Sequence, residues 1–224
     1  MIRGLFITAT GTGVGKTFVS RGLARALVSR DTTVAALKPL ETGCVAGHAE
    51  DATALARAAR RPELAHAPGL YRATRPAAPY AAALGGEPAV PPTADLVRAV
   101  HDACVGATHA IVEGAGGLLV PLDATRTTAD LVRALGFPAL VVAPDALGVL
   151  SHVLTLEHAA RALSIPLAAV VLSRHDDGDA SRDSNARILS ERLAVPVYVF
   201  PRIPDDDDAL ARAVESAGLL RAFG

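Results

Sequence analysis

The sequence predicts an α/β fold, a doubly wound and mainly parallel sheet with helices on both faces. Strand-length apolar segments alternate with helical patterns along the chain, as in proteins built from repeated β-α-β units. The strands are almost continuously apolar, which is typical of a sheet buried on both faces. At 224 residues, half of them apolar, the chain is long enough for one sizeable core, and we expect a single domain over residues 1–224.

The expected elements alternate, with one interruption. Strands are expected at 5–9, 34–37, 109–113, 138–143, 166–172 and 195–200, where short apolar runs occur. Helices are expected at 18–27, 51–60, 93–105, 127–135, 148–163 and 181–193, where apolar residues recur at helical spacing. The Pro-, Ala- and Gly-rich segment 61–92 is bracketed by helices and lacks the charge of disordered chains, so it should be a structured excursion. The four aspartates at 205–208 should be a solvated loop and helix start.

The first strand leads into the segment Thr10-Gly11-Thr12-Gly13-Val14-Gly15-Lys16-Thr17, and a helical pattern follows. Glycines let backbone N–H groups converge on one anion, and the positive end of a helix dipole adds to the attraction, so the segment predicts a phosphate-binding loop. In such a loop Lys16 contacts the β and γ phosphates, and Thr17 offers a hydroxyl to Mg²⁺. The common spacing would place glycine where this chain has Thr10, so the loop is a variant. Motif and context predict the P-loop NTPase architecture; the alternative is a glycine-rich turn that binds no ligand.

Lysine is rare in this chain. Of 22 basic residues only Lys16 and Lys38 are lysines, and the other 20 are arginines. Lysine is a compact charge on a flexible stem whereas arginine is a planar fork, so we expect both positions to need lysine for its chemistry beside a phosphate. Lys38 follows the second strand, and right-handed crossovers bring the ends of parallel strands to one edge, so the two lysines should share a cleft. A solvated charge at a strand end is the alternative for Lys38.

Two acidic residues are candidates for holding the metal ion. Glu113 ends its strand and is followed at once by Gly114-Ala115-Gly116-Gly117, whose N–H groups would face the same cleft. A carboxylate at the end of a central strand occupies the place where phosphate-loop proteins hold Mg²⁺. Asp51 opens its helix, and the sequence leaves two roles open for it, an N-cap or a second metal carboxylate.

Composition argues against several classes of protein. The net charge is −1, which gives no basic excess for general nucleic-acid binding, and the apolar runs are too short to predict a membrane segment. Cys44 and Cys104 lie in no metal-binding motif and fit a reducing compartment; with a first strand that begins within about three residues of the N-terminus, they predict a cytoplasmic protein. His152 and His158 should lie on opposite faces of one helix, so neither is expected to bind a metal.

The order of these motifs resembles one family, the ATP-dependent dethiobiotin synthetases of biotin biosynthesis. The resemblance covers nearly the whole chain and includes the phosphate loop, Lys38-Pro39-Leu40-Glu41-Thr42-Gly43, Asp51, the segment 76–82, Glu113-Gly114-Ala115-Gly116-Gly117 with Pro121, Leu147-Gly148 and Ile203-Pro204. It implies a homodimeric cyclo-ligase that takes 7,8-diaminononanoate, CO₂ and ATP, or another NTP, with Mg²⁺. One amine would capture CO₂ as a carbamate, whose oxygen would attack the γ phosphate to give a carbamic-phosphoric anhydride. The second amine would then close the ureido ring and release phosphate.

The resemblance also implies roles for individual residues. Lys16 and Lys38 would be catalytic, gripping carbamate and phosphoryl oxygens as preorganised electrostatic stabilisation. Thr17, Asp51 and Glu113 would hold Mg²⁺. The nucleotide would be bound by Thr12, Gly13, Val14, Gly15, Lys16, Thr17, Glu113, Ser173, Pro201, Ile203 and Pro204. The substrate would be bound by Thr12, Lys38, Thr42, Gly116, Gly117, Leu118, Leu147, Gly148 and Leu150, the last three at a helix N-terminus of the partner subunit that receives the distant carboxylate.

Three positions depart from the pattern of the family. Ala9 replaces a glycine that is usual at the start of the loop and would stiffen the turn. Tyr80 stands where histidine is frequent, so that contact is not transferred. Ser173, followed by Arg174, replaces the asparagine that commonly contacts adenine; because the chain's only asparagine is Asn185 and it has no glutamine, backbone recognition or a relaxed nucleotide preference is our hypothesis.

Proteins of other classes share parts of this pattern. A switch ATPase of the partition or septum-positioning type is the leading alternative, but it would carry a second lysine at the start of the loop and a basic or amphipathic surface. The segment Ala9-Thr10-Gly11-Thr12 contains no lysine. An amidotransferase-linked synthetase of the cobalamin pathway would need a glutaminase domain, for which 224 residues leave no space. A non-catalytic nucleotide sensor stays open.

Overall fold

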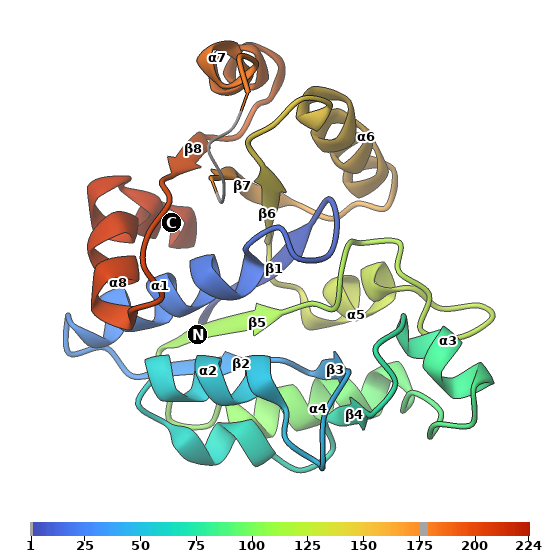
Figure 1. The fold of residues 1–224 in the computed structure, drawn as a ribbon. Coiled ribbons are helices and arrows are strands. Elements are labelled where there is room, and N and C mark those ends of the chain that lie inside the picture. Colours follow the sequence, from blue (N-terminus) through green and yellow to red (C-terminus); the bar gives the residue numbers. More distant parts are fainter. Residues whose placement is uncertain (1, 175–178) are drawn as a thin grey trace.

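The computed structural model describes residues 2–174 and 179–224 and confirms the predicted α/β fold. A central sheet has the strand order β2-β5-β1-β6-β7-β8, and all its neighbouring pairs are parallel (Figure 1). The strands are β1 (Arg3–Ala9), β2 (Val34–Leu37), β5 (His109–Glu113), β6 (Ala139–Pro144), β7 (Leu167–Ser173) and β8 (Val197–Phe200). Because β1 lies between β5 and β6, the chain starts in the middle of the sheet and builds outwards in both directions. The carboxyl ends of these strands therefore meet at one edge.

Helices cover both faces of the sheet. They are α1 (Lys16–Val28), α2 (Glu50–Ala58), α4 (Thr93–Ala103), α5 (Thr128–Leu135), α6 (Val149–Ala162), α7 (Arg182–Arg192) and α8 (Asp207–Ser216), with short 3₁₀ segments at Pro62–His66 and Leu219–Phe223. Side chains alternate across β1, so that Leu5 and Ile7 join the core under α1 and α8 while Phe6 joins the core under α4, α5 and α6. Each face of the sheet thus has its own apolar core. Among the described residues, no helix combines the length and the apolar character needed to cross a membrane.

The predicted excursion between α2 and α4 is structured. It contains β4 (Tyr71–Ala73) and α3 (Pro79–Leu84), neither of which the sequence had predicted individually. β4 pairs in parallel with β3 (Leu40–Thr42), a strand that follows Lys38 after a short break, and the two form a small separate sheet. Figure 1 shows this sheet beside the carboxyl end of β2. The excursion therefore supports the edge of the central sheet where the predicted site lies.

Candidate functional site

The predicted phosphate loop connects β1 to α1 at the carboxyl edge of the central strand. Gly13 and Gly15 have φ angles of 72° and 94°, in the left-handed region that residues with a side chain rarely adopt. Gly15 is the N-cap residue of α1, so the free N–H groups at the start of that helix lie in the loop. Lys16 folds back over the loop, where its Nζ donates a hydrogen bond to the Gly11 carbonyl at 3.2 Å. The loop thus has the backbone geometry of an anion site at the predicted position.

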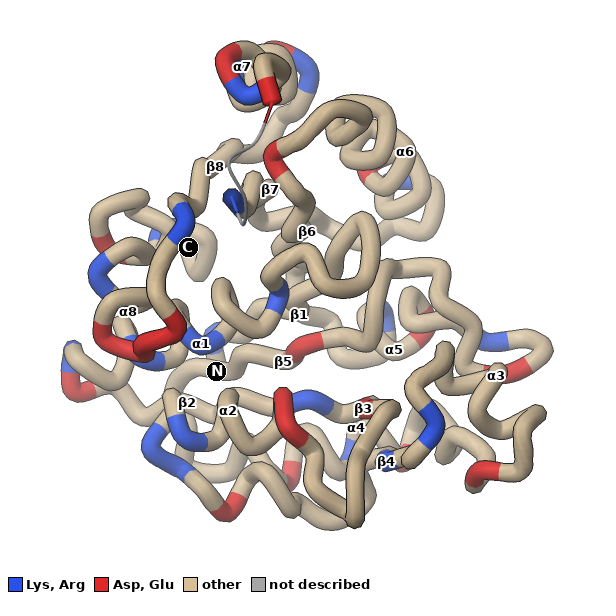
Figure 2. Tube along the Cα trace, in the orientation of Figure 1, with Lys and Arg blue, Asp and Glu red and all other residues tan. Residues whose placement is uncertain are grey.

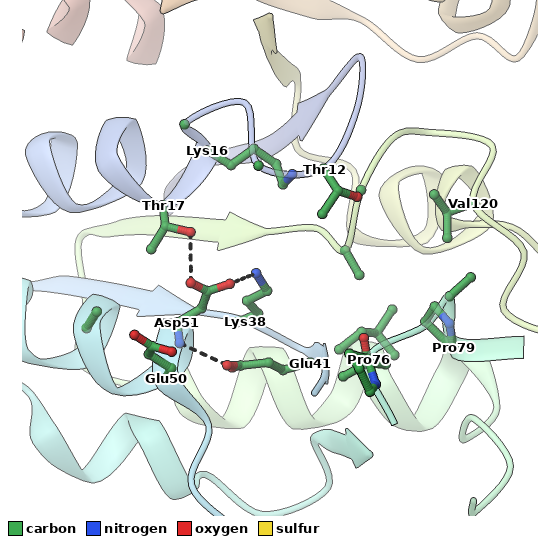
Figure 3. Close-up of a pocket in the computed structure, with 18 of the residues that line it drawn as sticks. Thr12, Lys16, Thr17, Lys38, Glu41, Glu50, Asp51, Pro76, Pro79 and Val120 are labelled. Atoms are coloured by element: carbon green, nitrogen blue, oxygen red, sulfur yellow. Dashed lines mark hydrogen bonds and ion pairs between the residues drawn. The ribbon is translucent and has the colours of Figure 1, made fainter. Parts of the chain in front are cut away.

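Next to the loop, four polar side chains form one cluster, Thr17, Lys38, Asp51 and Glu113, of which Figure 3 labels the first three. Thr17 Oγ1 lies 3.0 Å from Asp51 Oδ1 and 3.0 Å from Glu113 Oε1. Lys38 Nζ donates to Glu113 Oε1 at 2.8 Å and also contacts Asp51 Oδ2. The fold therefore brings together the three residues expected to hold the metal, which come from α1, α2 and β5. It adds the second lysine, which follows β2.

Both lysines are buried, with 6% and 7% of their surface exposed. Burial lowers the pKa of Lys16, although Glu113 acts in the opposite direction. Burial also acts against the charged form of Lys38, but the Glu113 and Asp51 carboxylates outweigh it and raise the pKa. Lys38 is therefore a fixed positive partner of two acids, and the alternative of a solvated charge at a strand end is wrong.

The donor set of the cluster fits a magnesium ion. Asp51, Glu113 and Thr17 offer hard oxygen ligands, and the Oε2 atom of the fully buried Glu113 has no hydrogen-bond partner among the described residues. Leaving a buried carboxylate oxygen unpartnered is unfavourable, and a cation would remove that cost. The described residues contain no group of three or more His, Cys, Asp or Glu side chains suited to a metal. A site of two carboxylates and a hydroxyl suits Mg²⁺, whose other ligands are usually water and phosphate oxygens.

A pocket of about 690 Å³ joins this charged cluster to an apolar wall, and we call it the phosphate pocket because residues of the predicted phosphate loop line it. Of the predicted site residues, those lining it are Thr12, Gly13, Gly15, Lys16, Thr17, Lys38, Thr42, Asp51 and Gly116. The wall opposite the cluster consists of Pro76, Ala77, Ala78 and Pro79 together with Val120. The two lysines do share a cleft, as predicted, and the pocket offers an anion-binding end and a hydrocarbon-binding end.

Glycines after Glu113 let two loops approach closely. A Cβ atom on Gly117 would lie 2.8 Å from the carbonyl oxygen of Ala9 at the end of β1. Gly116 has a φ angle of 73°, and a Cβ atom there would lie 2.8 Å from the Val120 side chain. Neither position can carry a side chain without displacing its neighbours, so glycine is required here by packing as well as by any ligand. The predicted substrate residue Leu118 is anchored by a side chain that is 2% exposed.

Four other residues predicted to bind the nucleotide lie outside this pocket. Pro201, Ile203 and Pro204 line a second pocket of about 540 Å³ between β8 and α8. The next residue, Asp205, lines the phosphate pocket, so the two pockets adjoin along the chain. Ser173 ends β7 and is 2% exposed.

The third predicted group, Leu147, Gly148 and Leu150, lies at the start of α6. Gly148 is the N-cap residue of this helix with a φ angle of 93°, and the Leu147 N–H donates to the carboxylate of Asp179 at 2.8 Å. Leu147 is 83% exposed. Among the described residues that line the phosphate pocket, none belongs to this group, so one chain does not bring it to the lysines.

Comparison with known proteins shows the family to which the chain belongs. A family model described as an AAA domain matches residues 3–210. An ATP-dependent dethiobiotin synthetase from Anaeromyxobacter dehalogenans (strain 2CP-C) is 40% identical over 99% of this chain and 98% of its own length. Another from Nitrosospira multiformis is 36% identical over 96% of this chain and 94% of its own. The chain belongs to the dethiobiotin synthetase family.

Solved structures show the breadth of the fold around this family. The septum site-determining protein MinD from Pyrococcus horikoshii, complexed with Mg-ADP, has a TM-score of 0.59 at 16% identity over 100% of this chain and 93% of its own. A ParA family ATPase from Chlorobium tepidum has a TM-score of 0.53 at 18% identity, covering 97% and 90%. At such identities the likeness shows the P-loop fold alone, and the sequence relatives decide in favour of the synthetase family over the switch ATPases.

The structure shows the surroundings of two positions that depart from the pattern of the dethiobiotin synthetases, Ala9 and the segment Ser173-Arg174. Ala9 is the fully buried last residue of β1, paired with Val142, so it belongs to the strand and does not stiffen the turn. Asn185, the chain's only asparagine, donates from Nδ2 to Asp145 Oδ1 at 3.0 Å. Arg174 Nε donates to the other oxygen of the same buried carboxylate at 2.8 Å. The amide that could have replaced the missing base-contacting asparagine is therefore bound within the protein.

The structure excludes one of the two roles that the sequence left open for Asp51 in this member of the dethiobiotin synthetase family. Asp51 is not an N-cap: α2 begins at Glu50, its N-cap residue is Ala49, and no side chain of that residue caps it. The Asp51 carboxylate is instead held by Thr17 and Lys38. The backbone N–H groups that an N-cap would satisfy are bound by Glu41, a buried acid that the sequence reasoning did not single out. The sequence feature that could have pointed to Glu41 is its place three residues after Lys38, as the one charged residue of β3.

The prediction for the aspartates at 205–208 is half right. Asp206 caps α8 by accepting the N–H of Ala209, which confirms the helix start. Three of the four aspartates are exposed, as expected, but the run is not only solvated, because Asp205 and Asp207 both accept hydrogen bonds from the buried Arg21, at 2.6 and 2.8 Å. Figure 2 shows this acidic run against the basic residues of α1. Since Arg21 follows Thr17 by one helical turn, it joins the last helix to the helix of the phosphate loop.

Proposed function

We propose that the protein is a dethiobiotin synthetase, which uses Mg²⁺ and ATP or another NTP to carboxylate 7,8-diaminononanoate with CO₂ and to close its ureido ring. One observation carries the proposal. The pocket lined by the phosphate loop is also lined by a second buried lysine, by the Asp51 carboxylate and by an apolar wall, and that lysine is bound from behind by the buried Glu113. A carbamate, a nucleoside triphosphate and a hydrocarbon chain need those three features together.

The chemistry joins two anions. A substrate amine takes up CO₂ to give a carbamate, whose oxygen must then meet the γ phosphate of the nucleotide. Lys16 and Lys38 offset the repulsion between them, and because both are buried their charges act in a medium of low dielectric. Bound Mg²⁺ would supply further positive charge on the phosphate oxygens, held by Thr17, Asp51 and Glu113.

The remaining steps depend on position rather than on proton transfer by the protein. The backbone N–H groups of the loop and of α1 would fix the leaving β phosphate, with Thr12, Gly13, Val14 and Gly15 forming the cradle. The wall from Pro76 to Pro79 would hold the methylene chain so that the second amine reaches the carbamoyl carbon. Attack by that amine on the carbamoyl carbon closes the ring and expels phosphate, which takes up the proton that the amine loses. The pocket would thereby favour the reaction of the second amine with the carbamoyl carbon of the same molecule.

We propose further that the active form is a homodimer. Leu147, Gly148 and Leu150 would receive the substrate's distant carboxylate from the partner subunit, and the 83% exposure of Leu147 supports a contact outside the single chain. Sedimentation analysis should give twice the mass of the chain, and Leu147→Asp should shift it toward the monomer with loss of turnover. A fully active wild-type monomer would contradict this arrangement. We place the enzyme in the cytoplasm, where its two buried free cysteines stay reduced.

The decisive experiment follows labelled bicarbonate into an acid-stable product. Incorporation should require 7,8-diaminononanoate, a nucleoside triphosphate and Mg²⁺, and phosphate should be released in equal amount. Omission of the diamine is the matched control, because carbamates without ring closure decompose in acid. Absence of incorporation by folded protein would refute the proposed function.

A further inference from the structure

The carboxylate of Glu41 holds the start of α2. Its Oε1 accepts the N–H of Asp51 at 2.8 Å and its Oε2 accepts the N–H of Ala52 at 2.9 Å. The residue is 6% exposed and lines the phosphate pocket. The N-cap residue, Ala49, offers no side-chain acceptor, so β3 supplies from outside the helix what an N-cap side chain would supply. A negative charge at this helix end is also favoured by the helix dipole.

Asp51 is where this capping meets the metal-binding cluster. Its N–H is bound by Glu41 while its carboxylate contacts Thr17 and Lys38 (Figure 3). The hydrogen bond from Thr17 is 3.0 Å long, so a displacement of the first turn of α2 by about 1 Å would break it. Glu41 therefore acts on the backbone of the residue whose side chain must point at the ion.

The partner strand of the small sheet supports the other half of the cluster. In the β3–β4 register Glu41 lies opposite Arg72, and Arg72 Nη1 donates to the carbonyl oxygen of Lys38 at 2.9 Å. A second bond from Arg72 runs to Ala65 at 3.3 Å, which fixes the guanidinium under the end of β2. The small sheet thus touches the backbones of both Asp51 and Lys38.

We propose that Glu41 is a positioning residue for the metal site, which sets the Asp51 carboxylate by clamping the first turn of α2 to β3. The inference rests on the proposed function only in taking the Thr17, Asp51 and Glu113 cluster as the cation site. Glu41 itself donates no ligand in this arrangement. Its contribution passes through two backbone N–H groups, and Arg72 steadies the strand pair from which it acts.

The test compares Glu41→Gln with Glu50→Gln. Glutamine keeps the shape of Glu41 but has one acceptor oxygen, so its amide group would face the N–H of Asp51 or Ala52. Glu50 lies in the same helical turn, is exposed and lines the same pocket, so its replacement removes the same charge without touching the clamp. The probe is Mn²⁺, titrated by electron paramagnetic resonance in the presence of ADP, which needs no turnover. Glu41→Gln should weaken Mn²⁺ binding about tenfold or more, whereas Glu50→Gln should stay within about twofold of wild type.

A purely structural role for Glu41 would give a different pattern. In that case thermal unfolding of Glu41→Gln would occur at a lower temperature while its Mn²⁺ affinity matched that of Glu50→Gln, and this result would overturn the proposal. If Glu41→Gln does not fold, Glu41→Asp serves instead: it keeps the charge, is one methylene too short to reach both N–H groups, and should show the same loss. Wild-type Mn²⁺ affinity in that variant would be equally decisive against the proposal. A wild-type protein that forms no dethiobiotin would refute the proposed function and leave the Mn²⁺ comparison to decide on Glu41.

Discussion

Lys38 Nζ lies 2.8 Å from Glu113 Oε1, although the two residues are 75 positions apart in the sequence. Lys38 directly follows β2 and Glu113 ends the neighbouring parallel strand β5, so the sheet itself brings them together. Glu113 is fully buried and Lys38 is 7% exposed. A buried carboxylate needs a positive partner, and Lys38 provides one. The same lysine therefore stabilises the fold of the site and is available to the reaction.

Replacement of Lys38 by arginine should lower turnover about 100-fold, the scale of losing one group that stabilises developing charge. The variant keeps the positive charge, but a planar guanidinium does not fit between Asp51 and Glu113 with the geometry of an ammonium. Steady-state assays of dethiobiotin formation measure the effect, and thermal unfolding verifies the fold. The reverse exchange Arg98→Lys, on the surface of α4, is the control and should change nothing. Near-normal turnover by Lys38→Arg would refute the argument from the rarity of lysine.

Nucleotide preference should be weak. Ser173 replaces the usual base-contacting asparagine, and Asn185 is bound to Asp145, so among the described residues no asparagine amide is free to recognise adenine. A site discriminates strongly between bases when the wrong base leaves a buried amide of the protein unpaired. This chain offers no such amide among its described residues, so discrimination between nucleotides should be small. We expect kcat/KM values for CTP and GTP within about tenfold of that for ATP. Measurement of the three donors at fixed diamine and Mg²⁺ concentrations tests this, and a strict preference for ATP would count against relaxed recognition.

The sequence was sufficient for those features that depend on short-range pattern or on chirality. Strand-length apolar runs predicted the six strands of the central sheet, and the handedness of β-α-β units predicted that Lys16 and Lys38 share one cleft. The rarity of lysine added an argument that local pattern could not give. Two of the three glycines of the loop, Gly13 and Gly15, also lie where the backbone adopts left-handed angles.

Features that depend on long-range partners escaped the sequence. The small β3–β4 sheet consists of strands too short to show alternation. An N-cap role for Asp51 was open because aspartate is a favourable cap. The contacts of its carboxylate with Thr17 and Lys38, and the hydrogen bond from its N–H to Glu41, outweigh that local preference. The ion pairs of Arg21 could not be predicted from the sequence. Its partners, Asp205 and Asp207, come close only when α8 packs against α1.

Arg21→Met should lower the free energy of unfolding by about 2 to 3 kcal/mol. The Arg21 side chain is 5% exposed and holds Asp207, which is 18% exposed, so removing the guanidinium leaves a carboxylate in a partly dry site. The methionine keeps most of the apolar packing between α1 and α8. Asp205→Asn is the matched comparison and should cost less than about 1 kcal/mol, because the Asp205 side chain is 66% exposed. Urea denaturation measures both, and equal effects would show that exposure does not decide the strength of these pairs.

Cys104 should make stability fall as pH rises above 9. Burial raises the pKa of its thiol from 9.0 to about 11, so the unfolded chain loses this proton first and binds fewer protons between those two values. The contribution of the neutral thiol is thus fully present below pH 9 and is lost as the pH approaches 11, to the extent of about 2 kcal/mol near the upper end. Urea denaturation of wild type and Cys104→Ala at about pH 8 and about pH 10.5 isolates this share, because every other titration is common to both proteins. The variant's deficit in stability should shrink by about that amount at the higher pH, and a deficit that stays constant would show that the thiol titrates alike in the folded and unfolded chains.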